Sequence, residues 1–134
     1  MVADLLNHLQ LLDGQVAEYD YLLKQAAKED ERSQRMMQVP GIGPTTATAL
    51  LASIGNGHEF KNGRQLAAWL GLVPGQYSSG GKPKLGRITK QGDRYIRTLL
   101  ILGAKSVLAT ASEKTDRFSQ WVQALRVVLA MAKR

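Results

Sequence analysis

Apolar side chains follow a regular pattern in the first part of the chain. Seven of them are separated alternately by four and three residues: Leu5, Leu9, Leu12, Val16, Tyr19, Leu23 and Ala26. This is the heptad spacing of a coiled-coil helix. A helix of this length is not stable on its polar face alone, so the stripe must pack either on a second copy or on its own domain. Because the stripe is narrow and flanked by charges, residues 1–37 are expected to form a long coiled-coil helix that joins subunits through residues 5–26.

The pattern changes after residue 37, which predicts a second domain over residues 38–134. Pro40 and the neighbouring glycines end the first helix, Pro44 suits the first turn of a new helix, and Gly55 ends it. Helix, Gly-hydrophobe-Gly turn and helix form the helix-hairpin-helix pattern, although the same turn also occurs in ordinary helix pairs. In the DNA-binding interpretation, backbone N–H groups at the start of the new helix bind phosphate. The candidate DNA-binding residues of this turn are Gly41, Ile42, Gly43, Thr45 and Thr46.

Three further helices are predicted along the rest of the chain. They run from Asn62 or Gly63 to Leu70 with Leu66, Trp69 and Leu70 buried, from about Gln91 to about Ala111, and from Asp116 to Lys133. Residues 71–86 between them are rich in Gly, Pro and Ser, which indicates a loop or a short hairpin. The predicted fold class is therefore all-α: a long N-terminal coiled-coil helix, then a compact helical domain with a helix-hairpin-helix element and a Gly/Ser loop.

Composition narrows the class of protein. The chain of 134 residues has no cysteine, which excludes disulfides and thiolate metal sites. No apolar run approaches the ~20 residues that a membrane span needs, and the N-terminus lacks the apolar core of a signal peptide. His8 and His58 have no metal-ligand spacing to another ligand, so no metal site is predicted in this chain. The expected location is the cytoplasm, with no membrane contact.

Charge is distributed unevenly. Residues 1–32 hold seven acids and three bases, a net −4, whereas residues 82–97 hold six bases and one acid, a net +5. Such a cationic segment favours a polyanion, most commonly the phosphate backbone of nucleic acid. The candidate phosphate contacts are Lys82, Lys84, Arg87, Lys90, Arg94 and Arg97. These contacts read no base, so binding is expected to be largely independent of sequence.

Two serines, Ser78 and Ser79, directly precede this segment. They have two interpretations: a Gly/Ser turn, or a nucleophile for phosphoryl transfer beside cations that would neutralise the phosphate. A serine hydroxyl needs a base for activation, and the one local acid, Asp93, is better explained as a helix-start residue or an ion-pair partner. From the residues alone, the turn is the simpler interpretation of the serines, and phosphate binding is the better interpretation of the charge.

The combined motifs of residues 36–112 resemble the C-terminal domain of the insertion-sequence one-ten family of transposases, with their one-sixteen and eleven-eleven relatives. The motifs are PGIG, AAWLGL, YSSGG, GRITKQG and RYIRTL. The acidic heptad helix resembles the family segment that pairs subunits. After Lys114-Thr115-Asp116-Arg117, which still fits the family, the end of the chain is less similar to it.

The resemblance implies a site-specific DNA recombinase that moves a mobile element, guided by a structured bridge RNA. In the family, a RuvC-like domain holds magnesium through four acids, and the C-terminal domain supplies a serine nucleophile. By position that serine is Ser79, with Ser78 as the alternative. This sequence contains no RuvC-like domain, so magnesium is expected outside this chain, and the chain is expected to be inactive alone. Two alternatives stay open: a non-catalytic helix-hairpin-helix DNA-binding module, and a dimerising remnant that regulates the complete transposase.

Overall fold

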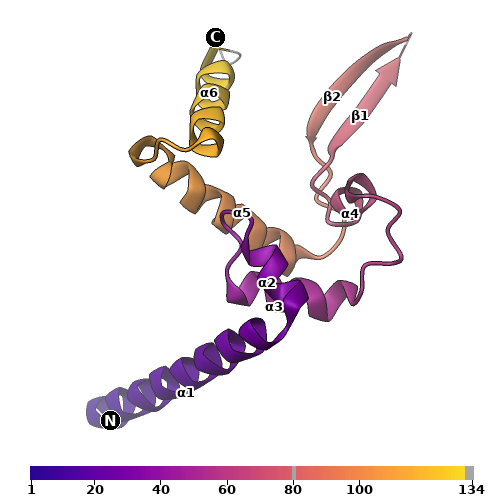
Figure 1. The fold of residues 1–134 in the computed structure, drawn as a ribbon. Helices are drawn as coiled ribbons and strands as arrows, with labels where there is room; N and C mark the ends of the chain where they lie inside the picture. Colours follow the sequence, from indigo (N-terminus) through magenta and orange to yellow (C-terminus); the bar gives the residue numbers. More distant parts are fainter. Residues whose placement is uncertain (80, 132–134) are drawn as a thin grey trace. The chain divides into compact units, whose positions relative to one another are not determined.

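The computed structural model describes residues 1–79 and 81–131, and the side chains at positions 78, 79, 82, 83 and 129–131 lie outside that description. The chain divides into two compact units, Met1–Gly57 and His58–Arg134. The first unit contains α1 (Val2–Glu29), α2 (Glu31–Met37) and α3 (Pro44–Ile54). The second contains α4 (Gly63–Trp69), β1 (Pro74–Ser79), β2 (Lys82–Ile88), α5 (Arg94–Thr110), the 3₁₀-helix η1 (Ala111–Glu113) and α6 (Arg117–Met131) (Figure 1).

The N-terminal segment is helical, but it is not the single helix predicted for residues 1–37. Asp30 has an extended backbone (φ −98°, ψ 115°) that ends α1 and begins α2. Its carboxylate accepts hydrogen bonds from the backbone N–H of Arg32 (2.8 Å) and from the Arg32 guanidinium (2.7 Å). Aspartate at this position caps the first turn of α2, which explains the break physically. Helix α2 ends at Met37.

The apolar stripe of α1 is exposed over most of its length. Leu5, Leu9, Val16 and Tyr19 are all exposed, whereas Ala27, in the last turns, is fully buried. The last part of α1 packs against α3, and the N-terminal part extends away from α2 and α3 (Figure 1). The structure of one chain therefore leaves the stripe uncovered, and the coiled coil stays a prediction.

The boundaries of α3 agree with the sequence pattern. Pro44 occupies the first turn, and Gly55 ends the helix with a positive φ of 53°. Ala47 and Leu50 are buried, as expected for its apolar face. The guanidinium of Arg32 in α2 also donates a hydrogen bond to the side chain of Asn56, which ties the start of α2 to the end of α3.

The second unit begins with a short helix and its aromatic contact. Asn62 caps α4 by accepting a hydrogen bond from the Gln65 N–H at 3.0 Å. The predicted burial is correct for Leu70, but Trp69 is 40% exposed. Its ring packs on Phe60 edge to face, with the centroids 5.7 Å apart, so one aromatic neighbour covers part of the indole and solvent reaches the rest.

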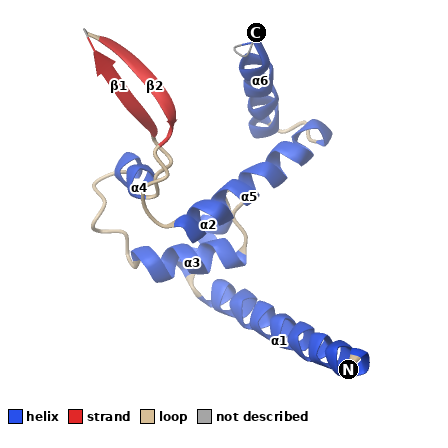
Figure 2. Ribbon diagram, turned by 180° about the vertical axis from the view of Figure 1, so that it is seen from behind, coloured by secondary structure: helices blue, strands red, loops and turns tan. Residues whose placement is uncertain are grey.

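The segment that follows α4 corrects the all-α prediction. Residues 74–88 form an antiparallel two-stranded sheet, and the rest of the described secondary structure is helical (Figure 2). The Gly/Ser segment thus forms a hairpin, the alternative that the sequence pattern allows beside a loop.

The remaining helices, α5 and α6, are joined through η1. Ile96, Ala111 and Val122 are buried along this part of the chain. Asp116 accepts hydrogen bonds from the hydroxyl and the backbone N–H of the buried Ser119, at 2.7 and 3.1 Å. These bonds lower the pKa of Asp116, chiefly through the hydroxyl. Each helix among the described residues is too short or too polar to span a membrane.

Candidate nucleic-acid interface

The β1–β2 hairpin carries the predicted serines and half of the predicted cations. Tyr77 pairs with Lys84 and Ser79 pairs with Lys82, while Gln76 pairs with Leu85 and Ser78 pairs with Pro83. Successive residues of a strand belong to opposite faces, and directly paired residues share a face. Positions 77, 79, 82 and 84 therefore share one face, and positions 76, 78, 83 and 85 share the other. The candidate nucleophile Ser79 lies on the face with two lysine positions; its side chain is outside the described part.

Four of the predicted cations lie in the described part and are exposed: Lys84, Arg87, Lys90 and Arg94. None of the ion pairs recorded for the described residues involves them. The neighbouring acid, Asp93, accepts a hydrogen bond from the Ile96 N–H at 2.9 Å and caps α5, as the helix-start interpretation predicts. Within the described part of the chain, the positive charge of this surface is therefore not balanced by a local ion pair, which is the electrostatic condition for binding an anion.

The base of the hairpin is joined tightly to the end of α4. The N–H of Thr89 donates to the carbonyl of Val73 at 2.9 Å, and the N–H of Lys90 donates to the carbonyl of Gly71 at 3.0 Å. Lys90 has a positive φ of 58°, a conformation that is rare for residues with a side chain. Such strain persists only where the surroundings hold the backbone in place, as these hydrogen bonds do here.

Two glycines allow the backbones at this junction to approach each other. A Cβ atom on Gly92 would lie 1.8 Å from the carbonyl oxygen of Trp69, and one on Gly71 would lie 2.0 Å from that of Gln91. Both glycines also have positive φ angles, of 98° and 69°. No other residue type fits either position without moving the backbone, so the glycines determine how the hairpin base meets the end of α4.

Arg97 differs from the other predicted phosphate contacts. It is only 8% exposed, and its guanidinium donates to the carbonyl oxygens of Leu70 at 3.2 Å and Gly92 at 3.5 Å. The carbonyls at the end of α4 have no intrahelical partner, and a buried cation there also complements the helix dipole. In this structure Arg97 stabilises the hairpin junction, and its side chain is not on the cationic surface.

The predicted Gly-Ile-Gly turn lies in the first unit. Gly41 has a positive φ of 89°, and the N–H of Ile42 donates to the carbonyl of Val39 at 3.1 Å. Gly43 is the N-cap of α3 and makes no side-chain cap, so N–H groups of the first turn are available to a ligand. Thr45 is partly exposed, but Thr46 is buried, which removes its hydroxyl from the surface. The turn belongs to the first unit and the hairpin belongs to the second.

The described residues contain no group of three His, Asp or Glu side chains that lie close enough together to hold a metal ion. The pKa of Asp30 falls to about 2, mainly because of the hydrogen bond from the Arg32 side chain. That carboxylate belongs to a helix cap. The described residues therefore do not fit a magnesium site.

Two positions of the hairpin, Tyr77 and Gly86, carry no distinguishing signal in the sequence. Tyr77 is 73% exposed, and a Cβ atom on Gly86 would lie 3.0 Å from its ring. Their relation depends on the register of the two strands, which includes a bulge between Pro74 and Gln76. A glycine nine residues after a tyrosine indicates nothing until that register is known.

A family model described as Transposase IS116/IS110/IS902 family matches residues 33–120, which include α3, α4, the hairpin and α5. Because this match covers more than half of the sequence, the chain belongs to the IS116/IS110/IS902 family of transposases. The match confirms the predicted resemblance and includes every candidate site residue.

Relatives in several bacteria support the assignment. The chain is 46% identical over 125 residues to a Pseudomonas aeruginosa protein named "Probable family 20 transposase". It is 43% identical over 125 residues to the transposase for insertion sequence element IS1111A of Coxiella burnetii. It is 37% identical over 116 residues to the transposase for IS1328 of Yersinia enterocolitica. These matches cover 93%, 93% and 87% of this chain but only 37%, 33% and 35% of the relatives, so the chain spans about a third of their length.

Proposed function

We propose that this chain is the DNA-binding C-terminal part of a transposase, and that its hairpin holds the phosphate backbone at the point of strand exchange. The observation that supports this most directly is a group of exposed cations on β2 and the residues that follow it, Lys84, Arg87, Lys90 and Arg94, which form no ion pair within the described part of the chain. Backbone hydrogen bonds hold the base of this hairpin against the end of α4. A braced cationic surface can bind phosphate without first ordering a flexible loop, which lowers the entropic cost of binding. The N–H groups at the start of α3 form a second phosphate contact in this proposal.

Ser79 is the proposed nucleophile. Its hydroxyl oxygen would form a bond to a DNA phosphorus, its proton would pass to a base in another part of the enzyme, and the bond from phosphorus to the departing sugar oxygen would break. The sugar oxygen would take up a proton. Cations at positions 82 and 84, on the face that contains position 79, would neutralise the phosphate oxygens. Magnesium would be held by a RuvC-like domain outside this sequence, so the chain alone is expected to bind DNA without cutting it.

The partners in this proposal are DNA, a bridge RNA whose backbone the same cations would accept, and a second copy of the chain bound along residues 5–26. Two alternatives have their own support. The available N–H groups in the first turn of α3 favour a non-catalytic DNA-binding module, and the uncovered stripe of α1 favours a dimerising regulator of the complete enzyme.

Salt-dependent binding tests the DNA-binding part. The affinity of the chain for a short duplex and for a branched junction, measured by fluorescence anisotropy, should fall linearly with the logarithm of salt concentration. Changing Lys84, Arg87 and Lys90 to Ala should lower the slope by ~0.9 for each lost phosphate contact and weaken binding to all sequences equally. The control is Lys24→Ala, an exposed lysine on the acidic helix α1, which should leave the slope unchanged. Equal slopes in all variants would refute the proposal.

The two serines provide a matched pair for testing catalysis. In a complete transposase that carries this domain, Ser79→Ala should abolish strand exchange and leave DNA affinity nearly unchanged. Ser78→Ala should retain strand exchange, because position 78 lies on the opposite face of the hairpin. Activity in Ser79→Ala together with its loss in Ser78→Ala would reverse the assignment. Activity in both would favour the non-catalytic module.

A further inference from the structure

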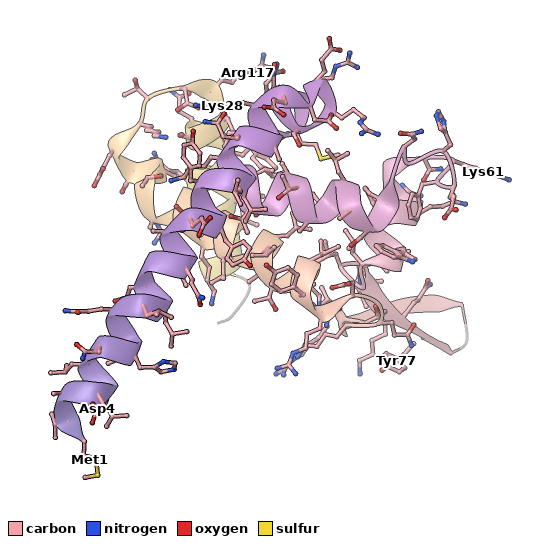
Figure 3. All side chains as sticks on the ribbon, turned by 90° about the horizontal axis from the view of Figure 1, so that it is seen from below. Met1, Asp4, Lys28, Lys61, Tyr77 and Arg117 are labelled. Atoms are coloured by element: carbon pink, nitrogen blue, oxygen red, sulfur yellow. The ribbon has the colours of Figure 1, made fainter. Side chains whose placement is uncertain are left out.

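Tyr77 lies on the surface of the hairpin over two residues that have no side chain. Its Cε2 atom is 3.0 Å from the position that a Cβ of Gly86 would occupy, and 3.8 Å from that of Gly75. Despite these contacts the residue is 73% exposed. Figure 3 labels Tyr77 on the hairpin. The glycines support one side of the ring, and most of the remaining surface faces solvent.

This arrangement differs from that of an aromatic residue in a core. Burial of aromatic surface stabilises a fold in proportion to the area that is removed from water. Tyr77 buries little of its surface, so its ring contributes little to stability in this way. This support limits the movement of the ring, because Gly75 and Gly86 beneath it belong to the two paired strands β1 and β2. A ring held in place loses little conformational entropy when a flat ligand covers its open side.

The surroundings of the ring indicate the chemistry of that ligand. The residue paired with Tyr77 across the strands is the exposed Lys84, and positions 79 and 82 follow on the same face. A supported aromatic ring beside cations is the combination by which proteins hold single nucleotides: the ring stacks on the base, and the cations bind the phosphate. In an intact duplex both sides of a base are covered by its neighbours, so such a ring can stack only on a base that has left the helix.

We propose that Tyr77 is a stacking platform for an unpaired nucleobase, which it holds beside the phosphate proposed to react at Ser79. This inference rests on the proposed DNA-binding function and adds a preference for locally unpaired DNA. Strand exchange requires base pairs to open, and a base stacked on Tyr77 would keep the opened strand on the face that contains position 79.

The test uses the full chain and two DNA probes that differ in one feature. One is a fully paired duplex, and the other is the same duplex with a single unpaired 2-aminopurine, whose fluorescence is quenched by stacking. The wild-type chain should bind the unpaired probe more tightly and quench it. Tyr77→Leu should weaken binding to the unpaired probe roughly tenfold and restore its fluorescence, with less than a twofold change on the paired probe. Tyr77→Phe should behave as wild type, because the ring is retained.

Two further variants separate stacking from damage to the fold. Gly86→Ala keeps the tyrosine but places a methyl group 3.0 Å from its ring, so it should displace the ring and reduce the preference for the unpaired probe. Tyr95→Leu removes another exposed tyrosine, 60% exposed on α5, and should leave the preference unchanged. If the wild-type chain binds the paired probe in a salt-dependent way and Tyr77→Leu loses the same affinity for both probes, the stacking platform is overturned. The DNA-binding proposal would then still stand. No binding of either probe by the wild-type chain would overturn both.

Discussion

The helix α1 and the β1–β2 hairpin both hold large apolar side chains in solvent, but they are supported in different ways. Along α1 the exposed stripe from Leu5 to Tyr19 lies on an element whose burial is confined to its last turns, near Ala27. The hairpin is held at its base by two backbone hydrogen bonds, two glycines and the buried Arg97. An exposed apolar stripe on a helix is expected to pack against another surface, whereas exposed residues on a hairpin that is held at its base can be presented to a ligand.

The largest effect is expected at a glycine in the junction between the hairpin base and the end of α4. Gly92→Ala would place a Cβ 1.8 Å from the Trp69 carbonyl oxygen at a φ of 98°, so we expect the second unit to lose more than about 3 kcal/mol of stability or to rearrange. Both tryptophans of the chain, Trp69 and Trp121, belong to that unit, so their fluorescence in a urea titration measures its unfolding. The control is Gly63→Ala in α4, where the space is open; it should be neutral or slightly stabilising. Similar losses in both variants would mean that the junction is not tightly packed.

The next effect tests whether α1 needs a partner. Changing Leu12 and Tyr19 to Glu places two charges on the exposed stripe, and self-association should weaken at least about a hundredfold, because burying an unpaired charge is costly. Analytical ultracentrifugation over a range of concentrations measures this. The matched control places the same two charges beside the stripe, at Gln10 and Ala17, and should change association little. A wild-type chain that stays monomeric at micromolar concentration would contradict the paired helix.

A comparison of Arg97 with Arg94 distinguishes a role in stabilising the hairpin junction from a role in binding phosphate. Arg97→Lys keeps the charge but loses the planar guanidinium that reaches two carbonyl oxygens, so the second unit should lose about 2 kcal/mol of stability. Arg94→Lys, at an exposed position three residues earlier, should stay within about 0.5 kcal/mol. The readout is the same tryptophan unfolding curve. If Arg97→Lys kept its stability and lost DNA affinity, Arg97 would be a phosphate contact after all.

The smallest effect concerns the break between α1 and α2. The folded pKa of Asp30 is about 2, below its ordinary value of 3.8, so the charged carboxylate stabilises the fold above about pH 4. That contribution should be lost as the pH falls from about 4 through 2. The carbon-13 chemical shift of the Asp30 carboxyl should titrate with a midpoint near 2. Asp30→Asn keeps an acceptor for the cap but cannot titrate, so its stability should depend less on pH in this range; identical pH profiles would refute the assigned cause.

Local signals predicted the local parts of the fold. Pro44 and Gly55 determine both ends of α3, and Asn62 and Asp93 begin α4 and α5 as caps, because the information lies within a few residues of each boundary. The break at Asp30 also had a local signal, since aspartate is a favoured cap, but the continuous heptad stripe concealed it.

The features that were missed depend on contacts between residues that are nine or more positions apart. Arg97 was expected on the surface because of its charge, and its burial depends on a carbonyl 27 residues earlier. Trp69 was expected to be buried, yet it is exposed, and Phe60 is its one aromatic neighbour among the described residues. The support of Tyr77 by Gly86 follows from a strand register and a bulge, which composition alone does not determine.

The length of α1 has a geometric consequence. Its 28 residues correspond to about 42 Å of helix at 1.5 Å per residue, and α1 contacts α3 only through its last part. Inserting or deleting one residue ahead of that contact would rotate the stripe by about 100° relative to the body of the first unit, whereas removing seven would nearly preserve its direction and shorten the helix by about 10 Å. The number of heptads therefore determines the distance at which a second copy could be bound. The phase of the heptads determines its orientation.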